Sequence, residues 1–515
     1  MTAPQPLRIT LGDLLDRANR YALANDIPNA ITAYEAALEP SKVPVGTILH
    51  NLMILYMRTR RFVEARAAAH AQVMFIKCAD SFFDLAAVLD KFANIDGAVE
   101  AIDRGVELEP MHNAAQSFRL FLLARSAPLQ YAYEEHKRVG QMLLPTVALR
   151  PAISYARPNR PRIGYVSGDF RQHTMHRIIE PLLRYHNLDR FDIYCYDTIN
   201  VPDATGSGMR HIPGLQWRNV ATLEDDEASR VIRQDNIDIL VDLSGYTFGH
   251  RLRLFTNWLA PVQLTWCGYQ HTTGLQCFTG RITDDQIDPV GVEELYTEPL
   301  IYLPAQYAVD FPLEPTVSPL PFDRNERITF GMVNSFCKVT PALIGDWTLI
   351  LTEVPDSRLV LIREGCSDEQ TGLETLRMFP EYVRDRIVLT ERTDPVGFEK
   401  ILAEIDIALD TFPYGGGVTS LHCLWHGVPV VGRIGDRGFN RTTPAVLQTL
   451  GMLDCVAHNR VEYVGAAVRM AGDIDGLRRL RQDLRPRCSD SPYFQPDKWV
   501  REVEMLYDSF WPEVF

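Results

Sequence analysis

Apolar residues follow two different patterns along the chain, which divide it into a helical part and an α/β part. Residues 1–150 look helical throughout, whereas from about residue 160 short apolar runs typical of strands take turns with helical stretches. A proline-rich passage at 311–321 separates two such series. We therefore predict four parts, which are a helical domain at 1–150, a first α/β half at 160–315, a second half at 325–490 and a C-terminal segment at 491–515.

The helical part repeats. Similar alanine-containing segments surround Ala30, Ala65 and Ala98, and the two spacings of 35 and 33 residues bracket the 34-residue tetratricopeptide period. Small side chains at these points allow the two helices of a repeat to pack closely. Such a solenoid either holds a protein partner on its concave face or forms a structural cap on the next domain.

The α/β part predicts two doubly wound sheets, because strands alternate with helices in both halves. Ligands of such sheets bind at the carboxyl ends of the strands, so we expect a cleft between the two halves. The amphipathic segment 496–510 is long enough to cross back onto the first half. The predicted strands are 162–167, 191–198, 237–244, 262–269 and 281–284, then 328–333, 358–363, 386–390, 405–409 and 428–431, with helices near 177–187, 223–235 and 248–258 in the first half.

A glycine-rich turn follows the predicted strand that ends at Asp410. The run Gly415–Gly417 lets the backbone bend sharply and leaves no side chain in the way of a ligand. Thr419 and Ser420 are natural caps for the following short helix, and Gly427 ends that helix. Free amides and the positive end of a helix dipole suit an anion, most naturally a pyrophosphate, and a tight turn without a ligand is the alternative.

Three further loops are candidates for the cleft. His173, after the first strand, is placed to act as a base or to contact a substrate, although a surface or capping histidine is the alternative. Lys338 stands beside the helix that Thr340 and a following proline begin, where it is either a second phosphate contact or a solvated lysine. The segments 242–247 and 266–274 carry the glycines and hydroxyls of a sugar or acceptor pocket, or of ordinary turns.

Composition and charge narrow the class of protein. The chain has 515 residues, too many for one ordinary core, and a net charge of −14 that argues against nucleic acid or an anionic membrane as the main partner. Nine cysteines without a CxxC motif or a ligand spacing fit reduced thiols. The first six residues lack a signal sequence, and no segment approaches a membrane span. We therefore expect a soluble, cytoplasmic protein.

Seven motifs, in order, resemble the catalytic region of the O-GlcNAc transferase family, and the resemblance covers about 160–510. It implies a GT-B fold and an inverting, metal-independent transfer of a sugar from a nucleotide sugar, UDP-GlcNAc by default, to a serine or threonine hydroxyl. The acceptor is a protein recruited by the repeats, and no cofactor is implied beyond the nucleotide sugar itself. The insertion of animal members is absent, so the chain is similar to bacterial types. The motifs are at 162–170, 237–247, 260–263, 266–269, 409–414, 424–429 and 491–494.

The resemblance also implies roles for individual residues. Lys338 would contact the donor phosphates and stabilise the departing diphosphate, and His173 would be the base or a contact to the acceptor or sugar. No metal ligand is implied, and no Asp-x-Asp motif of plausible placement is evident. The other implied donor contacts are Asn334, Ser335, Phe398, Gly416, Gly417, Val418, Thr419 and His422, and the acceptor-side residues are His176, Tyr246 and His271.

The chain departs from the family pattern at several of these positions. His422 replaces an acidic residue that contacts the ribose, Phe398 replaces a histidine that stacks on uracil, Gln270-His271 replaces Pro-Gly, and Gly280 replaces an aspartate. The loop at His173 is one residue shorter than in animal enzymes. Another donor, such as GDP-fucose or a CMP-linked nonulosonic acid as used on flagellin, is therefore an alternative. A non-catalytic repeat scaffold and a sugar-nucleotide enzyme such as a hydrolysing epimerase are the others.

Overall fold

The structure is a computed structural model that describes residues 11–38, 45–143, 158–201, 203–312 and 316–511. The first six residues, the end of the predicted helical domain at 144–150 and residues 313–315 of the predicted linker lie outside these ranges. The chain forms two compact units. Unit 1 is Met1–Leu122, Ser335–Ile344 and Leu361–Arg392, and unit 2 is Leu123–Asn334, Gly345–Val360 and Thr393–Phe515.

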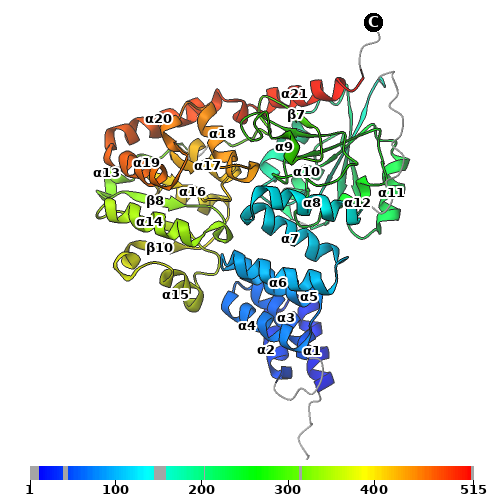
Figure 1. Cartoon of the computed structure of the whole chain (residues 1–515), viewed down its shortest axis with the longest axis horizontal. Coiled ribbons are helices and arrows are strands. Elements are labelled where there is room, and N and C mark those ends of the chain that lie inside the picture. The colour runs from blue at the N-terminus through cyan, green and yellow to red at the C-terminus, as the bar shows by residue number, and fades with distance from the viewer. Residues whose placement is uncertain (1–10, 39–44, 144–157, 202, 313–315, 512–515) are drawn as a thin grey trace, which may run out of the picture. The chain divides into compact units, whose positions relative to one another are not determined.

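The helices of unit 1 pair into antiparallel hairpins, α1 with α2, α3 with α4 and α5 with α6 (Figure 1). Ala30, Ala65 and Ala98 lie on the second helix of each pair and are fully buried, as close helix packing requires. The predicted helical repeats are thus confirmed. The helices are α1 (Leu11–Leu23), α2 (Ile27–Leu38), α3 (Val45–Arg58), α4 (Phe62–Phe75), α5 (Ala79–Lys91) and α6 (Ile95–Leu108).

A segment of the second α/β half packs with these helices inside unit 1. The Arg363 guanidinium is buried against three rings, with its carbon 4.5 Å from the ring centroid of Phe336, and burial lowers its pKa to about 10. Ion pairs of 2.8–3.3 Å join the repeats to the same segment. The other two rings are Phe62 and Phe92, and the ion pairs are Arg60–Glu391, Arg66–Glu374 and Lys91–Glu364.

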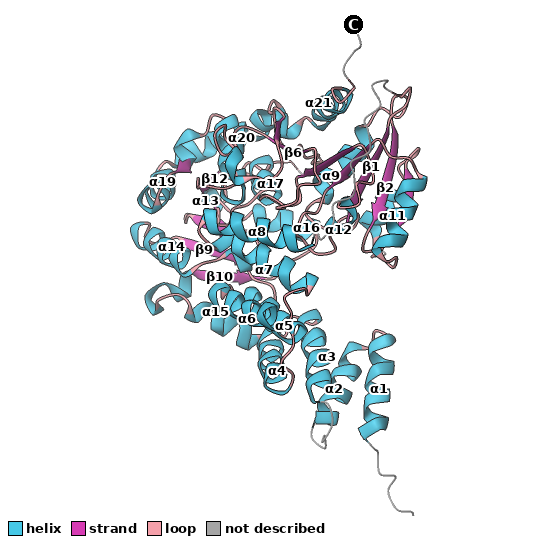
Figure 2. Cartoon of the chain, turned by 45° about the vertical axis from the view of Figure 1, so that its right-hand side comes forward, coloured by secondary structure: helices cyan, strands magenta, loops and turns pink. Residues whose placement is uncertain are grey.

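Unit 2 contains a seven-stranded sheet in the order β3-β2-β1-β4-β5-β6-β7, in which every neighbouring pair is parallel. The strand order reverses between β1 and β4, which is the point where ligands of such sheets bind, at the carboxyl ends of the strands. Helices α9 and α11 flank the sheet (Figure 2). The strands are β1 (Arg162–Ser167), β2 (Asp192–Asp197), β3 (Gln216–Asn219), β4 (Ile239–Asp242), β5 (Val262–Trp266), β6 (Gly280–Thr283) and β7 (Leu300–Tyr302), and the helices are α9 (His176–Tyr185), α10 (Ala204–Arg210), α11 (Asp225–Gln234), α12 (Leu252–Phe255) and η1 (Glu293–Leu295).

The second sheet has six strands in the order β10-β9-β8-β11-β12-β13, which reverses between β8 and β11. Two Rossmann-like halves confirm the GT-B fold. The strands are β8 (Thr329–Met332), β9 (Arg358–Ile362), β10 (Ile387–Thr390), β11 (Ile407–Leu409), β12 (Val430–Arg433) and β13 (Val456–Ala457), and the helices are α13 (Phe322–Asn325), η2 (Phe336–Lys338), α14 (Pro341–Glu353), α15 (Glu369–Arg377), η3 (Glu381–Arg386), α16 (Pro395–Leu402), α17 (Val418–Trp425), η4 (Gly438–Asn440), α18 (Thr442–Thr449), η5 (Leu453–Cys455), α19 (Arg460–Gly472) and α20 (Ile474–Ser489).

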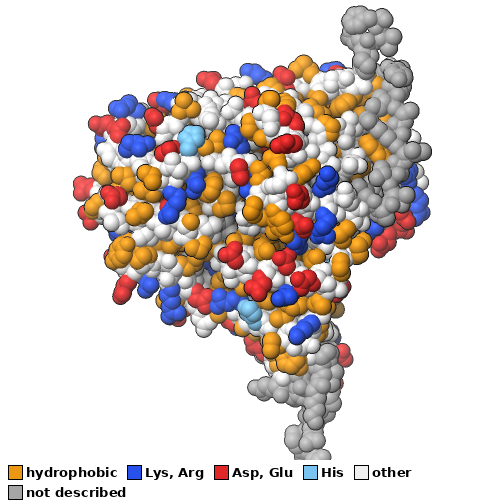
Figure 3. Space-filling model, in the orientation of Figure 1, with side chains coloured by type: hydrophobic (Ala, Val, Ile, Leu, Met, Phe, Trp, Pro, Cys, Tyr) orange, Lys and Arg blue, Asp and Glu red, His pale blue; other side chains and the backbone are white. Residues whose placement is uncertain are grey.

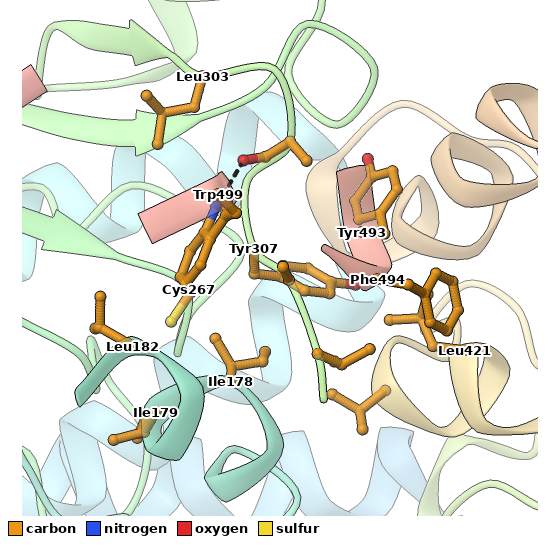
Figure 4. Packing of buried hydrophobic residues seen from close by; sticks show 14 of the residues in the cluster. Ile178, Ile179, Leu182, Cys267, Leu303, Tyr307, Leu421, Tyr493, Phe494 and Trp499 are labelled. Carbon is orange, nitrogen blue, oxygen red and sulfur yellow. Dashed lines mark hydrogen bonds between the residues drawn. The ribbon is translucent and has the colours of Figure 1, made fainter. Parts of the chain in front are cut away.

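The C-terminal helix α21 (Pro496–Asp508), which follows η6 (Pro492–Phe494), crosses back onto the first half, as predicted. Its Trp499 ring lies 5.1 Å from the ring of Trp266, and the indole N–H donates to the carbonyl of Ala305 at 3.1 Å (Figure 4). The Tyr507 hydroxyl lies 2.9 Å from that of Tyr165 on β1. This helix therefore closes the core over α9.

Charges of both signs are interspersed on the face of the molecule shown in Figure 3. This mixture is typical of a protein that does not bind polyanions over a broad surface. Within the described ranges, none of the helices combines the length and the apolar character that crossing a membrane requires.

Candidate functional site

The glycine turn is held by hydrogen bonds from both ends. The amide of Gly416 donates to the Asp410 carboxylate at 2.7 Å, and the amide of Gly415 donates to the carbonyl of Phe439 at 2.9 Å. A Cβ atom on Gly416 would lie 2.1 Å from the hydroxyl oxygen of Ser420. Only glycine fits this position, because a side chain would displace the start of the helix that follows.

Helix α17 begins directly after this turn, with Gly417 as its N-cap. The amides of Ser420 and Leu421 donate to the Gly417 carbonyl at 3.0 and 3.1 Å. Thr419 and Ser420 lie inside the helix, so the prediction that they cap it was wrong. The Gly417 cap has no side-chain hydrogen bond, and the first amides of a helix have no acceptor within it, so the turn offers backbone donors and a positive dipole end to an anion.

Tyr307 is a neighbour of this turn that sequence reasoning missed. Its side chain is 2 % exposed, and its hydroxyl is buried without a hydrogen-bond partner among the described residues. A Cβ atom on Gly417 would lie 3.6 Å from that hydroxyl. A buried hydroxyl without a partner is costly, so a ligand oxygen at the turn would satisfy it. Tyr307 lies in none of the recognised motifs, and only its position after β7 brings it here.

Asn334 joins the ends of β8 and β11. Its amide nitrogen donates to the hydroxyl oxygen of Thr411 at 3.0 Å, and that hydroxyl donates to the Tyr414 carbonyl at 2.6 Å. The structure therefore places Asn334 beside the glycine turn, at the point where the strand order of the second sheet reverses.

Ser335 and Lys338 belong to unit 1, at the two ends of η2. The amide of Lys338 donates to the Ser335 carbonyl at 3.1 Å. Thr340 caps α14 as predicted, since its hydroxyl oxygen accepts the amide of Leu343 at 3.3 Å. Lys338 thus stands directly before a helix start, where an ammonium group and helix amides favour the same anion.

His173 is held by a buried carboxylate. Its Nδ1 atom lies 3.2 Å from an oxygen of Asp169, which is 4 % exposed, whereas the imidazole is 39 % exposed. The Met175 amide also points to Nδ1, at 3.4 Å. The carboxylate is closer and charged, so we assign the proton to Nδ1 and the lone pair to Nε2. Burial raises the pKa of Asp169, and the neighbouring His173 and Arg171 lower it.

His176 begins α9 and lies close to the donor-side helix. Its Nδ1 atom is 2.5 Å from the His173 carbonyl. Burial is the main cause that lowers the pKa of His422 on α17, and charges on His176 and Arg177 lower it further. The start of α9, directly after His173, therefore lies near α17. The His422 ring packs against Phe311 and Phe398 at centroid distances of 4.6 and 5.0 Å.

Tyr246 and His271, which the sequence predicts on the acceptor side, are buried in the core. Each is 3 % exposed. The Tyr246 hydroxyl donates to the Thr273 carbonyl at 2.8 Å, and the His271 ring stacks on His136 of α8 (Leu129–Leu143) at 4.4 Å. His271 lines a cavity of about 10 Å³, about the room of one water, and neither of its ring nitrogens has a hydrogen-bond partner in the described part of the chain. Packing of α8 on this loop could not be foreseen from the loop itself.

Contacts between the two halves within unit 2 bring these loops together. The Tyr493 hydroxyl donates to Asp284 at 3.0 Å, and the indole of Trp425, at the end of α17, donates to the Pro312 carbonyl at 2.9 Å. The result is a backbone anion site on α17 and a carboxylate-held imidazole before α9 in one compact unit. A negatively charged leaving group and a hydroxyl nucleophile are the reactants that such a pair suits.

The sequence matches one protein-family model, which is described as glycosyl transferase family 41, over residues 145–311 and 320–503. Among curated proteins, the chain is 33 % identical over 392 residues to the probable UDP-N-acetylglucosamine–peptide N-acetylglucosaminyltransferase SPINDLY of Solanum lycopersicum, which covers 74 % of this chain and 42 % of that protein. The probable UDP-N-acetylglucosamine–peptide N-acetylglucosaminyltransferase SEC of Arabidopsis thaliana is 28 % identical over 364 residues, which are 68 % of this chain and 37 % of that protein. The chain thus spans about two fifths of the curated relatives that it matches.

A solved structure agrees over almost the whole chain. It is that of a lysine-to-methionine mutant of the O-GlcNAc transferase from Thermobaculum terrenum, with a TM-score of 0.88 and 29 % identity. The similarity covers 99 % of this chain and 98 % of that chain. It therefore includes the helical repeats as well as both halves.

Proposed function

Since the chain belongs to glycosyl transferase family 41, we propose that it transfers a sugar from a nucleotide-sugar donor to a serine or threonine hydroxyl of a protein. The observation that carries this proposal is the turn at Gly416, which presents backbone amides and a helix start at the switch point of the second sheet. The relatives are named as peptide N-acetylglucosaminyltransferases and the bacterial protein as an O-GlcNAc transferase, which supports a reaction of this kind.

The donor diphosphate is bound by backbone and lysine rather than by a metal. Amides at the start of α17 and the ammonium group of Lys338 stabilise the negative charge that develops on the departing diphosphate. The hydroxyl of Tyr307 is a further donor at the same turn. These groups replace the Mg²⁺ that neutralises such charge in other enzymes, so transfer needs no added Mg²⁺ or Mn²⁺.

The acceptor hydroxyl is activated by His173. Its oxygen attacks the anomeric carbon as the bond to the diphosphate breaks, the configuration inverts, and the hydroxyl proton passes to Nε2 of the imidazole. Asp169 holds the imidazole by Nδ1 and stabilises the imidazolium that results, which makes it a positioning residue.

UDP-GlcNAc is the default donor, and one observation favours testing others. The ring of His422, in place of an acidic ribose contact, packs against Phe398 and Phe311. These rings would bind the base of the donor nucleotide by stacking, and stacking distinguishes one base from another less well than hydrogen bonding does. GDP-fucose and a CMP-linked nonulosonic acid are the alternatives, and the N-terminal repeats recruit the acceptor protein.

Transfer is tested with the full chain and an acceptor protein co-expressed with it, incubated with each of the three donors. We expect a sugar-mass adduct on the acceptor with one donor, an unchanged rate when Mg²⁺ is added, and no adduct with Lys338→Ala. Consumption of the donor without an acceptor present would contradict protein transfer and indicate a sugar-nucleotide hydrolase. An adduct that persists in Lys338→Ala would contradict the assigned role of the lysine.

A further inference from the structure

Three side chains that offer metal ligands converge beside the donor-side helix. His422 lies on α17, His426 follows one turn later as the C-cap of that helix, and Glu399 comes from the helix α16. One ligand atom from each lies within 4.8 Å of the other two. The i, i+4 spacing places both imidazoles on the same side of α17, toward the carboxylate.

The surroundings of His426 leave one of its ring nitrogens available to bind a metal ion. It is 7 % exposed, and its Nδ1 atom lies 3.0 Å from the His422 carbonyl one turn earlier. Its other nitrogen, Nε2, is buried without a partner among the described residues. A backbone carbonyl at one ring nitrogen fixes the tautomer and leaves the lone pair on the other, which is the usual arrangement of metal-binding histidines.

The second imidazole is also constrained by its neighbours. The His422 ring packs against Phe311, Phe398 and the ring of His426, with centroid distances of 4.6–5.0 Å. This packing holds the ring in place, so one of its nitrogens stays near the other two ligand atoms.

We propose that Glu399, His422 and His426 bind a divalent transition-metal ion, with Zn²⁺ as the best match. Three atoms no more than 4.8 Å apart leave a point at most about 2.8 Å from each, so side-chain shifts of less than about 1 Å reach the 2.0–2.2 Å of zinc bonds. Two nitrogens and one carboxylate select zinc over Mg²⁺, which takes oxygen ligands. A fourth position stays open to water or a ligand oxygen.

The proposed zinc ion has a different place from the Mg²⁺ that binds the donor phosphates in other enzymes and that the proposed transfer does not need. The diphosphate lies at the first residues of α17, whereas the metal site lies one to two turns further along the helix and joins it to α16. Zinc binding is therefore a property of the folded protein, and it does not depend on the proposed function. A protein that binds zinc but transfers no sugar would contradict only the proposed function.

The site is tested by titrating the full chain, freed of metal by a chelator, with Zn²⁺ alone in a calorimeter. We expect one equivalent that is lost, or weakened at least about 100-fold, in Glu399→Gln and in His426→Gln. The matched control is His458→Gln, an exposed histidine of the same half, which should bind as the wild type does. Glu399 is only half buried, so its variant keeps the fold even if His426→Gln does not.

Substitution of Arg177 provides a second test, in which zinc binding should become stronger rather than weaker. The Arg177 guanidinium carbon lies 5.5 Å from the ring centroid of Phe311, and that ring stacks on His422, so its positive charge is close enough to repel a bound cation. Arg177→Gln should tighten zinc binding several-fold. Zinc that binds unchanged to Glu399→Gln and His426→Gln, for example at the half-buried thiols of Cys78, Cys337 or Cys366, would overturn the proposal.

Discussion

At the scale of single residues, the contact between Asp169 and His173 determines which nitrogen can accept a proton. The carboxylate lies 3.2 Å from Nδ1 and is almost fully buried, so it keeps the proton on that atom. An amide in its place would present an N–H or a weaker acceptor, and the tautomer would no longer be fixed.

We therefore predict that Asp169→Asn lowers kcat about 10- to 100-fold and changes the KM for the donor little, because the diphosphate contacts lie elsewhere. Steady-state kinetics with varied donor measure both. The control is Asp189→Asn, an exposed aspartate of the same half, which should leave kcat unchanged. Equal rates for Asp169→Asn and the wild type would show that the carboxylate does not position the imidazole.

Sequence motifs predicted the candidate site residues that directly follow a strand. They did not predict those that come near the site only through tertiary packing. The glycines and His173 follow strands whose apolar pattern is clear, so their place at a sheet edge could be predicted. Tyr307 and Glu399 carry no local signal, because each reaches the site through the packing of an element that is distant in sequence. The burial of Tyr246 could not be predicted for the same reason.

At the scale of elements, the turn before α17 is the feature that tolerates least change. A Cβ atom on Gly416 would also lie 2.9 Å from the Asp410 carboxylate, so the side chains of both Ser420 and Asp410 would have to move and the bond from the Gly416 amide would be disturbed. Gly472 at the end of α19 offers a contrast, since no atom lies within 4 Å of a Cβ atom built there.

Gly416→Ala should therefore abolish nucleotide binding and destabilise the fold by about 1–3 kcal/mol. Gly472→Ala should bind nucleotide normally and change stability by less than about 1 kcal/mol. Thermal unfolding with and without nucleotide measures both effects. Normal nucleotide binding by Gly416→Ala would contradict the assignment of the turn as the phosphate site.

The repeat helices contain a contact that makes their stability depend on pH. His50 on α3 lies 2.6 Å from the Asp84 carboxylate on α5, and this hydrogen bond is the main cause that raises the pKa of the imidazole. A proton bound more tightly in the folded state adds stability below the ordinary histidine pKa of 6.5, and that stability is lost as the pH rises through the higher folded value.

We predict that the wild type loses more thermal stability than His50→Gln between about pH 6 and about pH 9. The variant has no group that titrates at this position, and all other groups are the same in both proteins. Melting curves of the full chain at both pH values give the difference. A wild type whose loss equals that of the variant would contradict the raised pKa of His50.

Strands inside the two sheets were predicted within a few residues, whereas three strands at the sheet edges were not. The predicted strand 162–167 coincides with β1, whereas β3, β7 and β13 have four, three and two residues and were missed. A strand of that length owes its form to its neighbours in the sheet more than to its own side chains. The predicted helix at 248–258 shrinks to the four residues of α12 for the same reason.

At the scale of the whole molecule, each of the two compact units is built from segments that are far apart in the sequence. Unit 1 contains the repeats together with Ser335–Ile344, the segment of Lys338, and Leu361–Arg392 from the second half. Phe336 of the first segment packs on Arg363 of the other. The repeats, which we propose recruit the acceptor, and Lys338, which we propose contacts the donor, therefore belong to one compact unit, which the sequence order alone does not suggest.

The central claim is that this chain binds a nucleotide diphosphate or monophosphate through the glycine turn and Lys338. The most direct test is the thermal stabilisation of the purified full chain by UDP, GDP and CMP. At a hundredfold excess over its Kd, the cognate nucleotide should add about 2.7 kcal/mol to the free energy of unfolding. Lys338→Ala should lose this shift, and the exposed Lys498→Ala should keep it.

A shift with one nucleotide that disappears in Lys338→Ala would support the site and identify the donor class. No shift with any of the three, in a protein that is folded, would contradict the account and leave the repeats as the functional part of the chain.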